Sequence, residues 1–179
     1  MKKILLLTFI FLLSGCSNKI PKKTPNELLL AIKDYSCKMQ ISYSSNKNLT
    51  NYTAIQSYSS TGNYSMEFLD TENLKINYEN SILNISSELS ENNLELQNYP
   101  EINQNPLFLS YFIKTYFNSE ESNNIEITED TILLKLPNYN NSLHSAKLTF
   151  KNNLPYILTY FDVNGNEKVN IIYNEFTFI

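Results

Sequence analysis

The sequence predicts an α+β domain in which a strongly curved antiparallel β-sheet, a half-open barrel, carries two helices on its concave side. Apolar and polar residues alternate with a period of two along about ten segments, as in strands with one buried face. Two segments break this alternation, one before the first strand and one midway along the chain. The second is apolar on almost every side, so we expect a sheet that curls around it.

The first helix is expected from Pro25 to about Lys33. Thr24 is placed to cap it, Pro25 suits its first position, and Glu27 occupies the reciprocal position of a capping box. The apolar stripe of this helix consists of Leu28, Leu29, Ala31 and Ile32.

About five strands are expected between the two helices. Residues 35–44 alternate without a break, and their apolar side carries Tyr35, Cys37, Met39, Ile41 and Tyr43. A weaker alternation follows, in which Tyr52, Ala54 and Tyr58 share one side. The expected strands are 35–44, 49–59, 64–68, 74–78 and 82–86, with a further short one at 94–96.

The second helix is expected over residues 106–117. Asn105 is a candidate cap, and Pro106 suits the first helical position. Because apolar residues lie on most of its sides, this helix is expected to be deeply buried.

About five more strands are expected after the second helix, at 125–128, 132–136, 145–151, 156–162 and 168–176. Asn164-Gly165 lies between the last two strands. Asn-Gly favours the type I′ turn, whose twist matches that of a hairpin. A hairpin is therefore predicted around Asp162–Asn166.

The first 15 residues have the features of a signal peptide. Lys2 and Lys3 precede an apolar run at 4–13, and Ser14-Gly15-Cys16 is similar to a bacterial lipobox. That resemblance implies cleavage before Cys16 and attachment of lipid, including palmitate-like acyl chains, to the Cys16 sulfur. We expect a signal peptide at 1–15, a tether at 16–24 and one domain at 25–179, lipid-anchored on the extracytoplasmic face of the membrane. The alternative is an ordinary secretory signal peptide in which Cys16 has no role.

Charge and cysteine content argue against a nucleic-acid-binding protein and against an internal disulfide. All 14 basic residues are Lys, and the chain that starts at Cys16 has 12 of them against 18 acidic residues. An acidic chain without Arg is poorly suited to bind nucleic acid. With Cys16 acylated, Cys37 has no disulfide partner. Its place on the apolar side of a strand favours a small buried hydrophobe over a reactive thiol.

No recognisable catalytic, cofactor or metal site appears in the sequence. His144 is the one histidine, and it lacks the context of a triad, so we expect a surface residue. The chain has no phosphate-binding glycine loop and no spacing typical of metal ligands. Two acidic clusters, Glu120-Glu121 and Glu126-Glu129-Asp130, favour a solvated edge over a weak calcium site. We therefore expect a protein that is not an enzyme and carries no cofactor.

The chain has 13 Tyr and 10 Phe, and the sequence leaves their role open. Most can be core residues or cross-strand pairs. The functional alternatives are a hydrophobic cavity and a Tyr-rich protein-binding face. The open edges of such a sheet also offer unpaired backbone groups, so a homodimer is a further expectation.

The C-terminal strands carry a pattern that resembles a known family. Leu154-Pro155 opens a strand, Asp162-Val163-Asn164-Gly165 forms the turn, and Tyr173-Asn174-Glu175-Phe176 lies in the last strand. Together with the lipobox and the capped first helix, this is similar to the LolA/LolB-like lipoprotein-carrier fold and to clostridial spore-germination lipoproteins of the GerS type.

The resemblance implies a role for the chain. GerS-type lipoproteins bind and enable a spore-cortex N-acetylmuramoyl-L-alanine amidase, CwlD, which is needed for germination. The chain would then be a membrane-anchored partner of such an amidase, near the forespore membrane, with unknown contact residues. The alternative is a carrier or envelope sensor that binds an acyl chain in the concave sheet.

Overall fold

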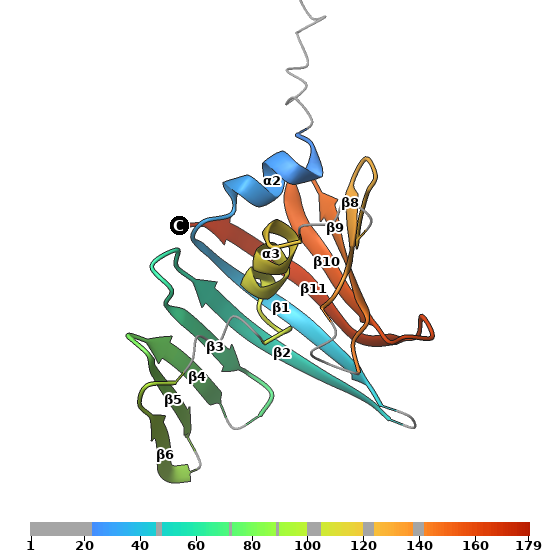
Figure 1. Ribbon diagram of the computed structural model, residues 1–179. Coiled ribbons are helices and arrows are strands. Elements are labelled where there is room, and N and C mark those ends of the chain that lie inside the picture. The colour runs from blue at the N-terminus through green and yellow to red at the C-terminus, as the bar shows by residue number, and fades with distance from the viewer. Residues whose placement is uncertain are drawn as a thin grey trace, which may run out of the picture.

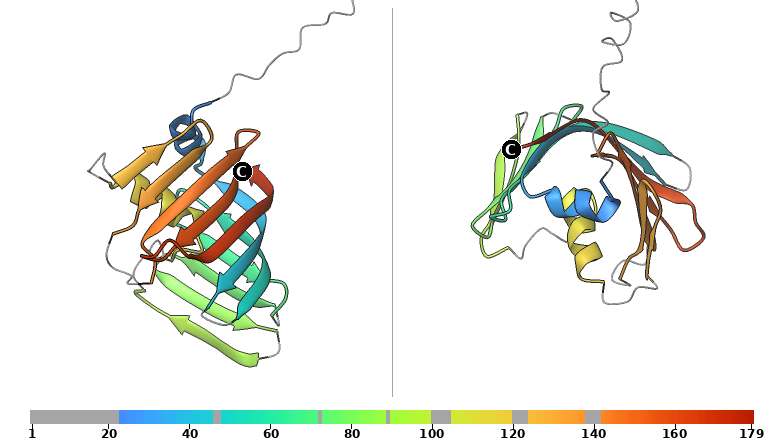
Figure 2. Two further views of the ribbon diagram at one scale, coloured as in Figure 1. Left: turned by 90° about the vertical axis from the view of Figure 1, so that its right-hand side faces the viewer. Right: turned by 90° about the horizontal axis from the view of Figure 1, so that it is seen from above.

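The computed structural model describes residues 23–45, 48–71, 73–88, 90–99, 105–119, 124–137 and 142–179. Eleven strands form one antiparallel sheet in the order β6-β5-β4-β3-β2-β1-β11-β10-β9-β8-β7. The sheet arches over two helices, α2 and α3, which both lie on its concave side (Figures 1 and 2). The predicted fold class is therefore confirmed.

Six strands precede α3 and five follow it. The elements are α2 (Pro25–Ala31), β1 (Tyr35–Ser44), β2 (Leu49–Tyr58), β3 (Tyr64–Phe68), β4 (Leu74–Glu79), β5 (Ile82–Ser87), β6 (Ser90–Leu96), α3 (Leu109–Phe117), β7 (Ile125–Ile127), β8 (Thr131–Lys135), β9 (Ser145–Lys151), β10 (Leu154–Phe161) and β11 (Glu167–Phe178). The expected signal peptide, Cys16 and nearly all of the tether lie outside the described residues. Among the described residues, no helix is long and apolar enough to span a membrane.

The capping box predicted for α2 is present. The Thr24 hydroxyl accepts a hydrogen bond from the Glu27 backbone N–H at 3.3 Å, and the Thr24 N–H donates to the Glu27 carboxylate at 2.8 Å. The helix ends at Ala31, earlier than the expected Lys33, because Ile32 adopts extended backbone angles of φ −82° and ψ 96°. Ile32 is nevertheless buried with Leu28 and Leu29, whereas Ala31, which was expected in the same apolar stripe, is exposed.

The core lines the concave side of the central strands. β1 pairs with β2 on one side and β11 on the other, and a bulge lies between Lys38 and Met39 in its pairing with β11. Tyr35, Cys37 and Met39 alternate inward and are almost fully buried. Because bulges bend and twist a strand, this one contributes to the curvature that the helices fill.

The predicted hairpin between β10 and β11 is present, but its turn is not of type I′, because Gly165 has a positive φ whereas Asn164 does not. Asp162 holds this turn. The Asp162 carboxylate accepts hydrogen bonds from the Asn164 N–H at 2.8 Å and the Asn166 N–H at 2.9 Å, and Lys168 lies 3.3 Å away. Gly165 adopts φ 79°, which a residue with a side chain rarely reaches.

The Asp162 carboxyl is expected to titrate below the ordinary range. Hydrogen bonds from the Asn166 side chain and backbone, followed by weaker ones from Asn164 and Lys168, lower its pKa from 3.8 to about 2. The stabilisation of the hairpin is therefore complete above about pH 4 and is lost as the pH falls through about 2. An NMR titration of the Asp162 carboxyl carbon tests this. In Asp162→Ala, amide exchange in the 162–166 turn should become faster and lose this acid dependence; an ordinary pKa would contradict the turn geometry.

Candidate functional site: the concave face

Helix α3 begins later than the sequence indicates. Residues 106–108 form a turn, in which the Asn105 side chain accepts a hydrogen bond from the Leu107 N–H at 3.0 Å. Asn105 therefore caps this turn, whereas the N-cap residue of α3 is Phe108, which makes no side-chain cap hydrogen bond. The expected start at Pro106 was wrong because cap-type residues close turns as readily as helices.

One side of α3 forms part of the core and the other remains outside it. Phe108, Leu109 and Phe112 are fully buried, and the Phe108 ring lies 5.3 Å from the ring of Tyr64 on β3. Phe117 is 47% exposed, and four further apolar side chains pack only partly against the core: Leu107, Tyr111, Ile113 and Tyr116. The expected burial on most sides is thus corrected, because an open sheet covers a helix on one side only.

Gln56 on β2 joins the start of α3 to the sheet. Its side-chain oxygen accepts hydrogen bonds from the Tyr35 hydroxyl at 2.6 Å and from the Leu109 N–H at 3.4 Å. Its amide nitrogen donates to the Leu107 carbonyl at 3.1 Å. Gln56 is fully buried, so it supplies partners for backbone groups that would otherwise lack both water and a cap.

Buried hydroxyl groups gather close to this connection. The hydroxyls of Ser110, Tyr160 and Tyr173 are buried and have no hydrogen-bond partner among the described residues. Burial, and then the neighbouring Tyr35, Cys37 and Tyr160, raise the pKa of Tyr173 well above its ordinary value. These phenols therefore stay neutral, and the cluster offers no general base at physiological pH.

Most aromatic residues belong to the core. The ring of Tyr35 stacks on that of Phe176, with ring centres 5.2 Å apart, and its centre lies 5.5 Å from the ring centre of Tyr58. The ring centres of Tyr58 and Tyr64 are 5.0 Å apart. The buried tyrosines are Tyr35, Tyr64, Tyr78, Tyr160 and Tyr173. Of the three roles left open by the sequence, cross-strand and core packing accounts for this set, whereas a Tyr-rich binding face would need these rings at the surface.

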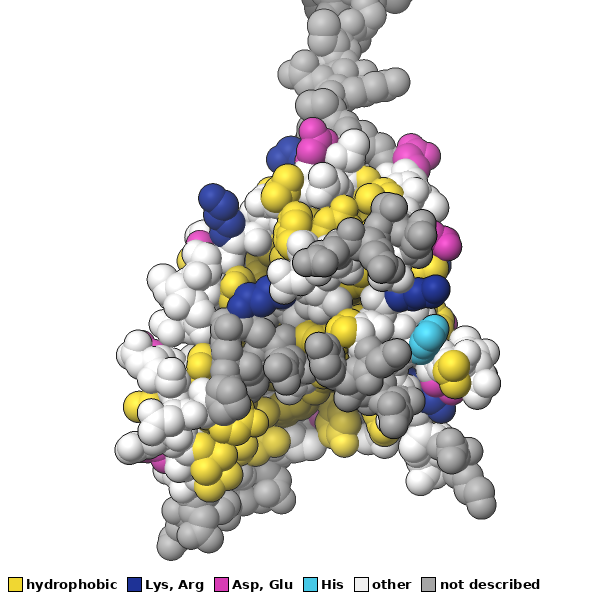
Figure 3. All heavy atoms as spheres, viewed as in Figure 1, with side chains coloured by type: hydrophobic (Ala, Val, Ile, Leu, Met, Phe, Trp, Pro, Cys, Tyr) yellow, Lys and Arg dark blue, Asp and Glu magenta, His cyan; other side chains and the backbone are white. Residues whose placement is uncertain are grey.

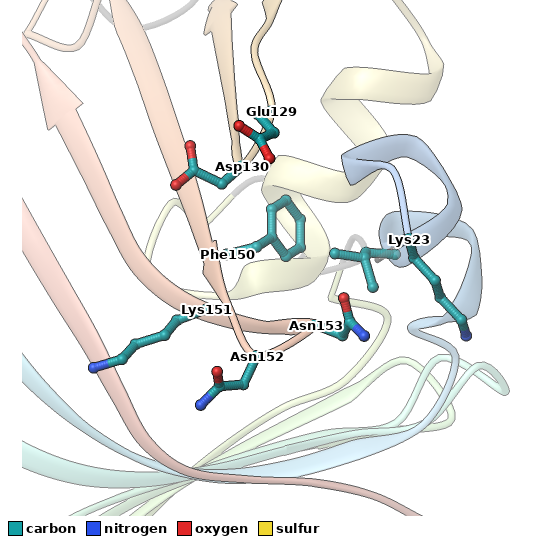
Figure 4. A pocket seen from close by; sticks show the side chains of 8 residues that line it. Lys23, Glu129, Asp130, Phe150, Lys151, Asn152 and Asn153 are labelled. Carbon is teal, nitrogen blue, oxygen red and sulfur yellow. The ribbon is translucent and has the colours of Figure 1, made fainter. Parts of the chain in front are cut away.

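A surface pocket lies where α2 meets the β9–β10 turn (Figure 4). Its volume is about 560 Å³, and its lining includes Leu28, Phe150, Lys151 and both acidic residues of the β7–β8 turn. Lys151 turns away from the other lining side chains, with its ammonium 4.8 Å from the centre of the Tyr156 ring (Figure 4). The pocket thus combines lysine and carboxylate side chains with the apolar Leu28 and Phe150.

The remaining candidate residues show no shared chemistry. Cys37 is buried and its pKa is raised to about 12 by loss of solvation, so it is the inert hydrophobe that the sequence predicts. His144 is exposed, as are Glu126 and the Glu129-Asp130 pair. Glu120 and Glu121 lie outside the described residues. Within the described ranges, no three His, Cys, Asp or Glu residues gather as metal ligands.

The concave face continues beyond α3 onto a part that the helices do not cover. We call residues 64–99, which contain β3 to β6, the β6 wing. Its inward row pairs Met66 with Ile76, Ile76 with Ile85, and Ile85 with Leu94. Exposure rises along this row, from 1% for Met66 through half-buried Ile76 and Ile85 to 49% for Leu94. Figure 3 shows hydrophobic side chains gathered over this end of the sheet.

Two features of this face were missed from the sequence. Gln56 falls on the same side of its strand as Tyr52, Ala54 and Tyr58. A polar residue on this otherwise apolar side is the feature of the sequence that could have indicated a buried hydrogen-bonding role. The sequence predicts a short strand at Leu94. It does not predict that this strand forms an edge of the sheet and leaves Leu94 exposed, because strand order is not visible in a local pattern.

A family profile described as "Sporulation protein YdcC-like" matches residues 1–178. A search of curated protein sequences gave no significant match. Among solved structures, an uncharacterized conserved protein from Thermus thermophilus aligns with a TM-score of 0.54 at 10% identity, covering 86% of each chain.

A LolA superfamily protein from Nitrosomonas europaea aligns at 10% identity with a TM-score of 0.39, covering 88% and 94% of the two chains. The structure of the CwlD amidase from Clostridioides difficile in complex with the GerS lipoprotein aligns with a TM-score of 0.53 at 22% identity, covering 86% of this chain and 91% of the other. The predicted GerS-like fold is thereby confirmed.

Proposed function

Because the chain belongs to the YdcC-like sporulation protein family, we propose that it is a membrane-anchored binding protein that docks onto and activates a cell-wall N-acetylmuramoyl-L-alanine amidase. The observation that carries this proposal is the shared fold: the sheet and helices described above match those of GerS, a lipoprotein whose structure is known in complex with the CwlD amidase. On the same grounds we propose a role in spore germination.

A binding role without catalysis agrees with the described residues. The phenols near α3 are held neutral, Cys37 is an inert thiol, and His144 is exposed without a triad. We infer that the hydrolytic chemistry belongs to the amidase and that this chain supplies a surface.

The experiment is a binding and activity assay with the sporulation amidase of the same organism. The full-length acylated chain, in detergent, should co-purify with this amidase and raise its rate of cortex peptidoglycan cleavage. An unrelated lipoprotein of similar size serves as the control. Absence of both binding and stimulation would rule the proposal out.

The alternative function is transport or sensing of an acyl chain. Phe108, Leu109 and Phe112 fill the concave face under α3, so the apolar surface left for such a ligand is the β6 wing, where Leu94 and Leu96 are exposed. Native mass spectrometry of protein purified from a lipid-rich host separates the two functions. A bound lipid would favour the carrier, and a protein free of lipid would favour the amidase partner.

The lipid anchor is proposed to act through local concentration. Cys16→Ala should leave the precursor uncleaved and without lipid, while the domain from Pro25 onward keeps its fold. Without the anchor, the chain and a partner at the same membrane are no longer held close together. The effective concentration of the chain near that partner falls, while the contacts between the two proteins stay the same. Fractionation with detergent-free washes tests this prediction: wild type should stay with membranes and be acylated, and Cys16→Ala should lack the acyl label. Equal labelling of both proteins would contradict the lipobox.

Assembly as a homodimer, through exchange of terminal elements, stays a prediction. The motivation is that β6 and β7 end the sheet, so each has a strand partner on one side only among the described residues. Light scattering at high micromolar concentration is the measurement, and a mass that stays at the monomer value would end this idea.

A further inference from the structure

We propose that the seven-residue edge strand β6 is the docking site for the partner, and that the partner supplies a β-strand with alternating apolar and Lys or Arg side chains. This proposal rests on the amidase-binding function and names the surface that performs it. Its basis is an uncovered apolar face and a row of backbone groups at one sheet edge, together with the unbalanced charge of the wing that ends at this edge.

The apolar part of the site consists of Leu94 and Leu96. They are 49% and 37% exposed, and they face the concave side because their partners Ile85 and Leu83 belong to the inward rows. Neither helix reaches this far along the sheet, as Figures 1 and 2 show. A strand added beside β6 would place every second side chain against these two leucines.

The charge of the chain is concentrated in the same wing. Residues 64–99 contain seven acidic residues and a single lysine, whereas the rest of the chain from Cys16 contains eleven acidic residues and eleven lysines. The whole net charge of the chain after its signal peptide therefore resides in this wing. Its lysine, Lys75, is already paired with Glu67 at 3.2 Å.

The two properties lie on opposite faces of the edge. Glu95 stands between the two leucines, so its side chain is directed to the convex face, where it is exposed and accepts a hydrogen bond from Gln97 at 3.2 Å. A partner strand with apolar residues on one side and cations on the other matches both faces at once. Opposite charges on directly neighbouring strands stabilise such pairing.

The other edge of the sheet differs in strand length and in the charge of its surroundings. β7 has three residues, and residues 124–161 contain three acidic residues and three lysines. Ile127 on β7 is 50% exposed, which is nearly the exposure of Leu94. The β7 edge therefore offers a matched control in which apolar exposure is the same while length and charge are not.

The experiment measures the dissociation constant of full-length acylated protein in detergent with the sporulation amidase of the same organism. Leu94→Asn and Glu95→Lys should each weaken binding by about tenfold, the range of a central interface residue. Ile127→Asn and Glu126→Lys should bind like wild type. Raising the NaCl concentration from about 50 to about 300 mM should weaken wild-type binding, and Glu95→Lys should reduce this salt dependence.

The outcomes separate the surface from the function. If wild type binds and both β6 variants bind equally well, the docking site is wrong and the amidase function stands. If the β7 variants lose as much affinity as the β6 variants, the choice of edge is wrong. If wild type does not bind the amidase, both proposals fall. Thermal unfolding of each variant identifies loss of fold, and Glu95→Lys, at an exposed position, decides if Leu94→Asn does not fold.

Discussion

Replacing Phe112 by alanine is expected to lower the free energy of unfolding by about 4 kcal/mol, because a fully buried phenylalanine is removed and the sheet cannot collapse into the space. Phe112 lies on the side of α3 that packs into the concave face. Urea unfolding followed by circular dichroism gives the value, provided that the slope of the transition is the same in both proteins.

Phe117→Ala is the matched control for this change. Phe117 lies on the same helix, is 47% exposed and contacts Tyr116 with ring centres 5.2 Å apart. Its replacement should change stability by less than about 1 kcal/mol, as for most surface positions. If Phe112→Ala costs no more than Phe117→Ala, α3 is a displaceable lid and the concave face becomes available to an acyl chain. A large difference means that α3 is a fixed part of the core.

The central strands could be predicted from the sequence because each has one buried face. The alternation in residues 35–44 exists because Tyr35, Cys37 and Met39 are buried on the concave side of the sheet while their neighbours are not. The sequence predicts the edge strand β6 too short, at 94–96 instead of Ser90–Leu96, because this strand lacks a continuous buried face. Asn93 and Leu94 are both exposed, so a strand at this edge is not constrained to alternate.

The ends of the helices depended on contacts that are distant in sequence. The first residues of α3 are fixed by Gln56, which lies 51 positions before Leu107 and 53 before Leu109, and local cap signals at Asn105 and Pro106 therefore indicated the wrong start. The extent to which α3 is covered depends on how far the sheet curls, which is set by all eleven strands together. The exposed β6 wing follows from strand order, which no local pattern contains.

Replacing Gln56 by leucine, of nearly the same size, is expected to cost about 3 kcal/mol, because the change removes a hydrogen-bond partner from three groups that are buried or partly buried. These groups are the Tyr35 hydroxyl, 2.6 Å from the Gln56 oxygen, the Leu107 carbonyl, 3.1 Å from its nitrogen, and the Leu109 N–H. Since the side chain is fully buried, water cannot take its place without entering the core. Urea unfolding of wild type and Gln56→Leu measures the loss.

A double-mutant cycle with Tyr35→Phe separates hydrogen bonding from packing. Tyr35→Phe alone leaves the Gln56 oxygen with one donor fewer and should cost about 1–2 kcal/mol. In the Gln56→Leu background the Tyr35 hydroxyl has lost its Gln56 acceptor and keeps the backbone hydrogen bond from Ser110, so the same change should cost less than in wild type, and the two losses should not add. Additive losses would mean that the Tyr35 hydroxyl contributes nothing to stability through Gln56.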